Sequence, residues 1–167
     1  MAASLVVACA AGVAACGGGD AGRNAAAAAV SQTFLNLKTP VQTMTTSQAA
    51  CFGTGVVNAF GVAQATKYGF MTADHKPVDH LSLTLSPRDA GTFADLYLSC
   101  ADPAPGIKNA LITQIAPRTA TAKQQLTACL DKNLTRALMR KALVAAASGD
   151  SADATLTPIF TACGRWG

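Results

Sequence analysis

Apolar residues recur every three or four positions along most of the chain, the spacing that gathers them on one face of an α-helix. This pattern predicts helices over residues 48–64, 87–100, 107–116 and 122–147, and a last one from about Asp153. Ser47, Ser86 and Thr121 precede three of these segments and are expected to cap them. Pro158 falls late for a first helical turn, so a kink is expected there.

Three other segments have weaker patterns. Residues 17–23 show no apolar period and predict a flexible tether. Residues 25–37 predict a helix that is ordered only in part, because its run of alanines buries little area. Residues 81–85, with the sequence LSLTL, alternate leucine with polar residues. A strand this short has no partner here, so we expect an extended connector that buries its leucines.

The second half of the chain repeats the pattern of the first. The residues around Cys51 match those around Cys129, and those before Cys100 match those before Cys163. This repeat predicts an all-α fold of five or six helices, built from two cysteine-bounded helical hairpins. The predicted parts are unit one at residues 47–101, a linker at 102–106, a bridging helix at 107–117 and unit two at 121–163, all within a helical domain at 47–167.

The first residues of the chain match an export signal. Residues 5–15 form an apolar run that is too short to span a bilayer, which takes about 20 apolar residues. The run ends in VAAC at residues 13–16, which resembles the lipobox of bacterial lipoproteins. This resemblance implies a signal peptide at residues 1–15, removed before Cys16, whose thiol then receives a diacylglycerol. Residues 16–46 would then hold the lipidated N-terminus, the tether and the weak helix.

Two alternatives to lipidation at Cys16 follow from the same residues. Residues 6–9 are also a partial match to the lipobox, which would make Cys9 the lipidated residue. Almost no apolar run precedes Cys9, so Cys16 is favoured as the lipidation site. In the second alternative, residues 1–15 form a buried helix and Cys16 is a plain thiol.

An even number of cysteines in an exported chain argues for disulfide bonds. Cys51, Cys100, Cys129 and Cys163 allow three pairings. Equivalent ends of repeated units should form equivalent bonds, which favours Cys51 with Cys100 and Cys129 with Cys163. A zinc site is disfavoured because the closely spaced cysteine pairs that such sites use are missing from the sequence. The predicted fold is therefore a small, disulfide-stapled, all-α helical bundle.

Four short segments carry a resemblance to a wider group of proteins. They are SPRD at residues 86–89, LYLSC at 96–100, QLTACL at 125–130 and FTAC at 160–163. Together they resemble small actinobacterial-type exported lipoproteins with paired-cysteine helical repeats, over roughly residues 47–163. The resemblance implies a helical fold and a place in the cell envelope. It implies no established activity and no site.

The net charge of the chain limits the kinds of molecule that it is expected to bind. Its 167 residues carry 13 Lys and Arg against nine acidic residues, all of them Asp, for a formal net charge of +4. This surplus is far from the dense basic surface of a nucleic-acid-binding protein, so no nucleic-acid partner is expected. A mildly positive exported protein is more suited to anionic lipid or polymer.

Two histidines form the one candidate for metal or acid–base chemistry. Asp74-His75 and Asp79-His80 are Asp-His pairs five residues apart, and together they are weak candidate ligands for a divalent metal. They fall in a predicted polar loop, which lacks the rigid frame that a site needs. No metal, no cofactor and no catalytic residue is therefore expected.

Three basic residues form a candidate membrane-facing surface. Lys132, Arg136 and Arg140 lie four apart on the helix predicted for residues 122–147, opposite its leucine stripe. They predict either a solvated helix face or a ridge that contacts anionic headgroups near the lipid anchor.

These features predict a non-enzymatic lipoprotein at the outer face of the cell membrane, attached by an N-terminal lipid. Its expected work is contact with another envelope protein or polymer. The alternative is a carrier that holds a small apolar ligand or lipid between the two helical units.

Overall fold

The computed structural model describes residues 17–37 and 44–164. Within these residues the chain forms seven α-helices and no strand, which confirms the all-α prediction although five or six helices were expected. The helices are α1 Gly17–Asn36, α2 Thr46–Lys67, α3 Pro87–Cys100, α4 Ala104–Ile115, α5 Ala120–Asn133, α6 Arg136–Ala147 and α7 Ala152–Cys163.

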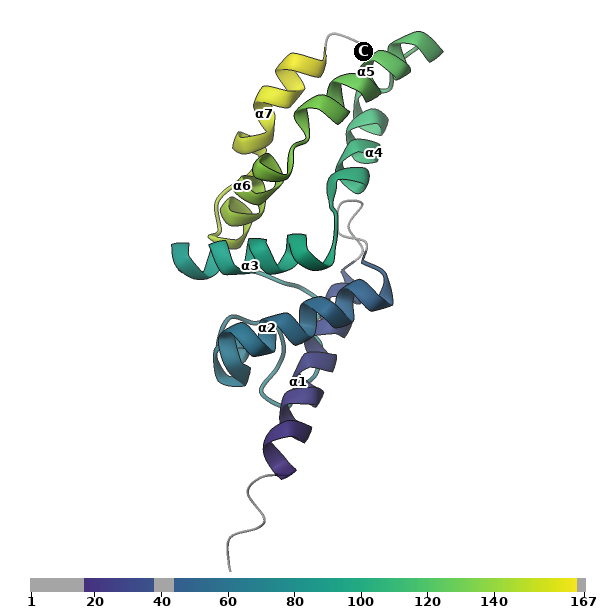
Figure 1. The fold of residues 1–167 in the computed structure, drawn as a ribbon. Coiled ribbons are helices and arrows are strands. Elements are labelled where there is room, and N and C mark those ends of the chain that lie inside the picture. The colour runs from purple at the N-terminus through teal and green to yellow at the C-terminus, as the bar shows by residue number, and fades with distance from the viewer. Residues whose placement is uncertain (1–16, 38–43, 165–167) are drawn as a thin grey trace, which may run out of the picture.

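Helix α3 lies across the middle of the molecule (Figure 1). Helices α1 and α2 lie on one side of it, and α4 to α7 lie on the other. Helix α3 packs against α2 and also against α6, so the two predicted units are joined through direct helix contact.

The two sides of α3 have different hydrophobic cores. One core is aromatic and gathers residues of α1, α2, α3 and the segment between α2 and α3, with Ala147 of α6. It includes Phe34, Phe52 and Phe93. The other is aliphatic and gathers residues of α3 to α7, including Leu126 and Leu130. The residue that packs against both cores is Leu143 on α6, among the partly buried residues that the structure describes.

Helix α1 corrects the prediction of a tether followed by a weak helix. Residues 17–23 are helical, and α1 makes the most extensive contact with α2 of any helix pair in the described chain. Ala26 and Val30 are fully buried in that contact. Alanines bury little area each, but they let two helix backbones approach closely. The sequence pattern gave no sign of this approach, because it depends on a glycine in the partner helix.

That glycine is Gly53, which is buried on α2. A Cβ atom built there would lie 2.4 Å from the carbonyl oxygen of Ala27 and 2.3 Å from Oγ of Ser31. Both residues belong to α1. Gly53 therefore sets the close contact between α1 and α2.

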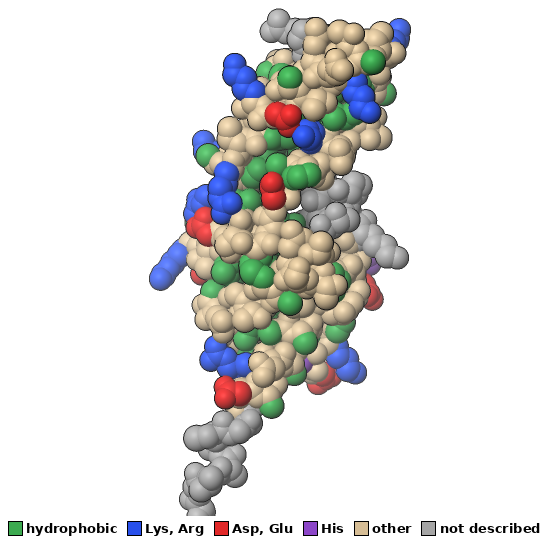
Figure 2. All heavy atoms as spheres, turned by 45° about the vertical axis from the view of Figure 1, so that its right-hand side comes forward, with side chains coloured by type: hydrophobic (Ala, Val, Ile, Leu, Met, Phe, Trp, Pro, Cys, Tyr) green, Lys and Arg blue, Asp and Glu red, His purple; other side chains and the backbone are tan. Residues whose placement is uncertain are grey.

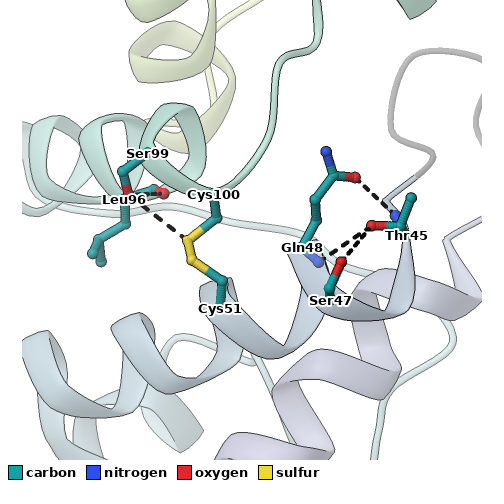
Figure 3. Close-up of a disulfide and its surroundings, with 7 residues drawn as sticks. All are labelled: Thr45, Ser47, Gln48, Cys51, Leu96, Ser99 and Cys100. Atoms are coloured by element: carbon teal, nitrogen blue, oxygen red, sulfur yellow. Dashed lines mark hydrogen bonds between the residues drawn. A yellow bond between two sulfur atoms is a disulfide. The ribbon is translucent and has the colours of Figure 1, made fainter.

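The start of α2 differs from the prediction by two residues. Thr45, not Ser47, caps the helix (Figure 3). The backbone N–H of Gln48 donates to Oγ1 of Thr45 at 3.3 Å, and the backbone N–H of Thr45 donates to Oε1 of Gln48 at 2.9 Å. This reciprocal pair is a capping box. Farther along, Gly61 has φ 75° and interrupts the helical geometry that was predicted without a break.

The cap predicted for α3 is confirmed. Oγ of Ser86 accepts a hydrogen bond from the backbone N–H of Asp89 at 3.2 Å, and Pro87 occupies the first helical position. Helix α4 begins at Ala104, inside the predicted linker, so the linker is shorter than expected. The last helix begins near the predicted residue and contains Pro158.

The prediction of one long helix over residues 122–147 is wrong. The chain forms α5 and α6, separated at Leu134, whose ψ of 65° is not helical. Thr135 then caps α6 by accepting a hydrogen bond at Oγ1 from the N–H of Leu138 at 3.3 Å. A threonine inside an apolar stripe can continue a helix or cap a new one, and here it caps. Helix α5 itself is capped by Thr119 rather than Thr121.

The connector between α2 and α3 spans residues 68–86. Residues 81–85 within it form neither helix nor strand, as predicted. The connector is fixed at one end where the N–H of Val78 donates to Oγ1 of the buried Thr33 at 3.0 Å. It is fixed at the other end where the N–H of Leu85 donates to the carbonyl of Ala147 at 2.8 Å. Of its three alternating leucines, Leu85 is buried, whereas the other two are partly buried.

Candidate functional site

The predicted disulfide pairing is confirmed. Cys51 bonds Cys100, with Cα atoms 5.7 Å apart, and Cys129 bonds Cys163, with Cα atoms 5.8 Å apart. The first bond joins α2 to α3, as Figure 3 shows, and the second joins α5 to α7. Each bond therefore crosslinks the two helices that bound one repeat.

The two disulfides differ in their surroundings. Cys51 is exposed and Oγ of Ser99 lies 3.7 Å from Sγ of Cys100, so this bond is open to solvent on one side. Cys163 is fully buried. The side-chain amide of Asn133 lies 3.5 Å and 3.8 Å from the two sulfur atoms of the second bond, and it donates to the carbonyl of Cys129 at 2.8 Å. The second disulfide is therefore the better protected from reductants.

The predicted lipidation site, Cys16, lies outside the described residues, as does Cys9. Helix α1 begins at Gly17, the residue that follows Cys16 in the sequence. Among the helices of the described residues, none has the length and hydropathy needed to cross a membrane.

The histidines lie at different places on the connector. His75 has φ 53° in a tight turn, in which its N–H donates to the carbonyl of Thr72 at 3.1 Å. His80 is exposed and lines a cavity described below. Across residues 17–37 and 44–164, the structure assembles no group of three or more His, Cys, Asp or Glu side chains that could hold a metal ion. Asp74 and Asp79 are both exposed.

The predicted basic ridge is not one helix face. Lys132 belongs to α5, whereas Arg136 and Arg140 belong to α6, so the break at Leu134 separates them. Arg140 forms a two-pronged ion pair with Asp95 of α3, with Nε–Oδ1 and Nη2–Oδ2 distances of 2.6 Å and 2.9 Å. That arginine therefore connects two helices.

Two carboxylates have altered acidity for structural reasons. The hydrogen bonds from Arg140 lower the pKa of Asp95. Hydrogen bonds from the hydroxyls of Tyr68 and Ser86 lower the pKa of Asp89. Asp89 lies at the N-terminal cap of α3, and Asp95 lies where α3 contacts α6. The hydrogen bonds that lower the two pKa values are therefore the ones that hold α3 in place.

The visible surface offers no single dominant patch. In Figure 2 the hydrophobic side chains reach the surface in separate areas, with acidic and basic side chains between them. A broad hollow of about 420 Å³ lies on the outer face of α5, lined by polar residues such as Lys123, Gln124 and Asp131. All its lining residues come from one helix, so it is an open surface depression rather than a binding site.

Two hollows beside α6 are better formed. The larger, of about 360 Å³, lies between α1, the connector, α3 and α6, and its lining includes His80, Leu81 and Leu83. The smaller, of about 120 Å³, lies between α3, α4, α6 and α7. Leu143 and Ala146 line both. An apolar cavity between the two units was predicted, but its residues were not, because Leu143 was assigned to a helix that the structure divides.

Comparison of the chain with protein-family models, curated proteins and solved structures yields no match. The fold and its crosslinks define the class: a small all-α domain stapled by two disulfides, within the residues described.

Proposed function

We propose that the protein is an exported, lipid-anchored helical module that works by contact with another component of the cell envelope. The observation that carries this proposal is the pair of closed disulfides, since such bonds persist in oxidising compartments and are rare in the cytosol. The VAAC sequence at residues 13–16 adds a means of membrane attachment.

The shape of the domain supports a contact role. Two crosslinks and the ion pair between Arg140 and Asp95 hold the helices on both sides of α3. A rigid surface loses little conformational entropy when it meets a partner, which favours binding. The partner class we propose is an envelope protein or polymer, and the reaction class is non-enzymatic.

Replacement of the lipidation cysteine tests the anchor. The Cys16→Ala variant is expected to appear in the soluble or secreted fraction, whereas the unaltered protein stays with membranes. Metabolic labelling with an alkyne fatty acid should mark the unaltered protein and leave the variant unmarked. Cys9→Ala is the matched control and should retain both the label and the membrane location. Membrane retention and labelling of Cys16→Ala would overturn the assignment.

A second candidate function is the binding of a small apolar ligand between the two units. The observation that favours it is the pair of hollows that share Leu143 and Ala146. Native mass spectrometry of protein purified from its own membranes should show an additional mass that is lost after organic extraction. A measured mass equal to that of the polypeptide and its lipid anchor alone would count against ligand binding.

A further inference from the structure

Tyr97 of α3 forms part of the wall of the smaller hollow. It is 2% exposed, and its ring lies 5.6 Å from that of Phe52 and 6.2 Å from that of Phe93, measured between centroids. These aromatic contacts fix the ring in one orientation. The hydroxyl group is therefore held at a defined place in the fold.

The hydroxyl of Tyr97 has no hydrogen-bond partner among the residues that the structure describes. In the same residues, no fully enclosed side-chain nitrogen or oxygen lacks a partner. The hydroxyl oxygen is therefore not fully enclosed, and the smaller hollow is a space that Tyr97 lines. Buried tyrosine hydroxyls normally find a partner, so this one is available to a guest molecule.

The rest of the hollow is apolar. The other described residues of its lining have no nitrogen or oxygen in their side chains: Pro103, Ile107, Met139, Ala142, Leu143, Ala146, Ala152 and Leu156. Ala146 is exposed while Tyr97 is buried, so the lining of the hollow runs from the surface to a buried tyrosine. One hydrogen-bonding group at the inner end of an apolar space fits a molecule with one polar group and an apolar body.

The volume and charge limit the ligand further. The hollow measures about 120 Å³. Apolar protein cavities of about 150 Å³ accept benzene, so the guest is of that size. Burial raises the pKa of Tyr97 to about 12, so its hydroxyl is un-ionised at neutral pH and can donate or accept a hydrogen bond. Among the described residues that line the hollow, none has a charged side chain to balance a charged guest.

We propose that this hollow binds a small uncharged molecule with a benzene-sized apolar body and one hydroxyl or carbonyl group, which hydrogen-bonds the Tyr97 hydroxyl. This proposal rests on the second candidate function above and names its site and ligand class. Leu143 forms the wall toward the larger hollow, where a substituent on the guest would extend.

Fluorine NMR with two probes tests the proposal. 4-Fluorophenol and fluorobenzene differ by the hydroxyl group, and both are titrated into the full-length protein with its disulfides formed. The protein should bind 4-fluorophenol more tightly. In Tyr97→Phe that preference should fall by about fivefold, the value of one ordinary hydrogen bond, while fluorobenzene binding stays unchanged. Tyr68→Phe, which removes the other tyrosine hydroxyl of the chain, should keep the preference.

A filling variant locates the site, and the outcomes separate the two claims. Ala146→Leu should weaken both probes, because residue 146 lines the hollow and is exposed at the surface. If fluorobenzene binds and Tyr97→Phe keeps the full preference, the role of Tyr97 is wrong while the apolar site stands. If neither probe binds the unaltered protein, both the site and the second candidate function fall. Neither result bears on the lipid anchor.

Discussion

At Gly53 the backbone of α2 passes so close to α1 that a side chain has no room. The nearest obstacle that cannot rotate away is the carbonyl oxygen of Ala27, 2.4 Å from the position of a Cβ atom. Ser31 adds to the crowding, because its Oγ already donates to that carbonyl at 2.7 Å. The order of the alanine-rich α1 therefore depends on one hydrogen atom in place of a side chain on its neighbour.

Gly53→Ala is expected to destabilise the protein by about 1–3 kcal/mol, since the added methyl group must push α1 away. Chemical denaturation with the disulfides intact measures this change, and hydrogen exchange should show faster exchange in α1. Gly22→Ala is the matched control. It lies on α1 with no atom within 4 Å of its added Cβ, so higher helix propensity should leave stability equal or raised. Equal stability of the unaltered protein and Gly53→Ala would contradict the close packing.

The lowered pKa values of Asp89 and Asp95 predict how stability depends on pH. A carboxyl group whose pKa is lower in the folded state binds more protons in the unfolded state. Its stabilising contribution is therefore complete above the ordinary value of 3.8 and is lost as pH falls below that value toward the lowered pKa. Denaturation midpoints measured at pH 7 and at pH 3 should show this loss.

Asp89→Asn isolates one of the two groups in that experiment. The variant should be less stable at pH 7, and the difference from the unaltered protein should shrink at pH 3. Asp74→Asn, on the exposed connector, is the control and should follow the unaltered protein at both pH values. A constant difference at both pH values would show that the loss comes from packing rather than from charge.

At the scale of elements, the sequence predicted a helix well where the residues that cap it and form its apolar face lie close together in the chain. Ser86 and Pro87 mark the start of α3, and the repeat of cysteines predicted both disulfides. The order of α1 could not be predicted, because the deciding residue, Gly53, lies on another helix. The division at Thr135 could not be predicted either, because the same stripe of leucines suits one helix or two.

The lining of the candidate cavity could be predicted from the sequence only in part. The alternative function predicted a space between the two units, but Tyr97 entered the sequence analysis only as part of the LYLSC segment at residues 96–100. Tyr97 matters because α3, α4, α6 and α7 leave a space that it lines. That space is a property of packing between four helices. No spacing along the chain encodes it.

Loss of the second disulfide is expected to act locally. Cys129→Ala/Cys163→Ala should cost about 3–4 kcal/mol in the chain-entropy account of a loop of this size, with a sequence separation of 34 residues. The core around this bond is aliphatic, whereas the other bond adjoins the aromatic core. Hydrogen exchange should therefore rise in α5 and α7 while α1 and α2 stay protected.

The equivalent change in the first unit is the comparison for that variant. Cys51→Ala/Cys100→Ala removes a bond that closes a loop of similar size, with a separation of 49 residues, so its cost in stability should be similar. Hydrogen exchange in this variant should rise mainly in α2 and α3. Uniform exchange through all helices in both variants would mean that the two units unfold as one.

At the scale of the whole molecule, α1 relates the proposed lipid anchor to the rest of the domain. The N-terminal end of α1 points away from α3, and α5 begins at the opposite end of the molecule (Figure 1). If Cys16 carries the lipid, α1 begins one residue from the membrane. Helices α4 to α7, with Lys132 and Arg136, are then expected to lie far from the headgroups, where they could contact the proposed envelope partner.

Energy transfer to the membrane tests this orientation. A fluorophore is placed by non-canonical amino acid at Asn24, exposed on α1, or at Thr121, exposed on α5, with an acceptor dye in the vesicle headgroups. Transfer should be strong from residue 24 and weak from residue 121. The Cys16→Ala protein should show little transfer from either position, because it lacks the anchor. Equal transfer from both positions in the lipidated protein would mean that the domain lies flat, with its basic residues free to reach the headgroups.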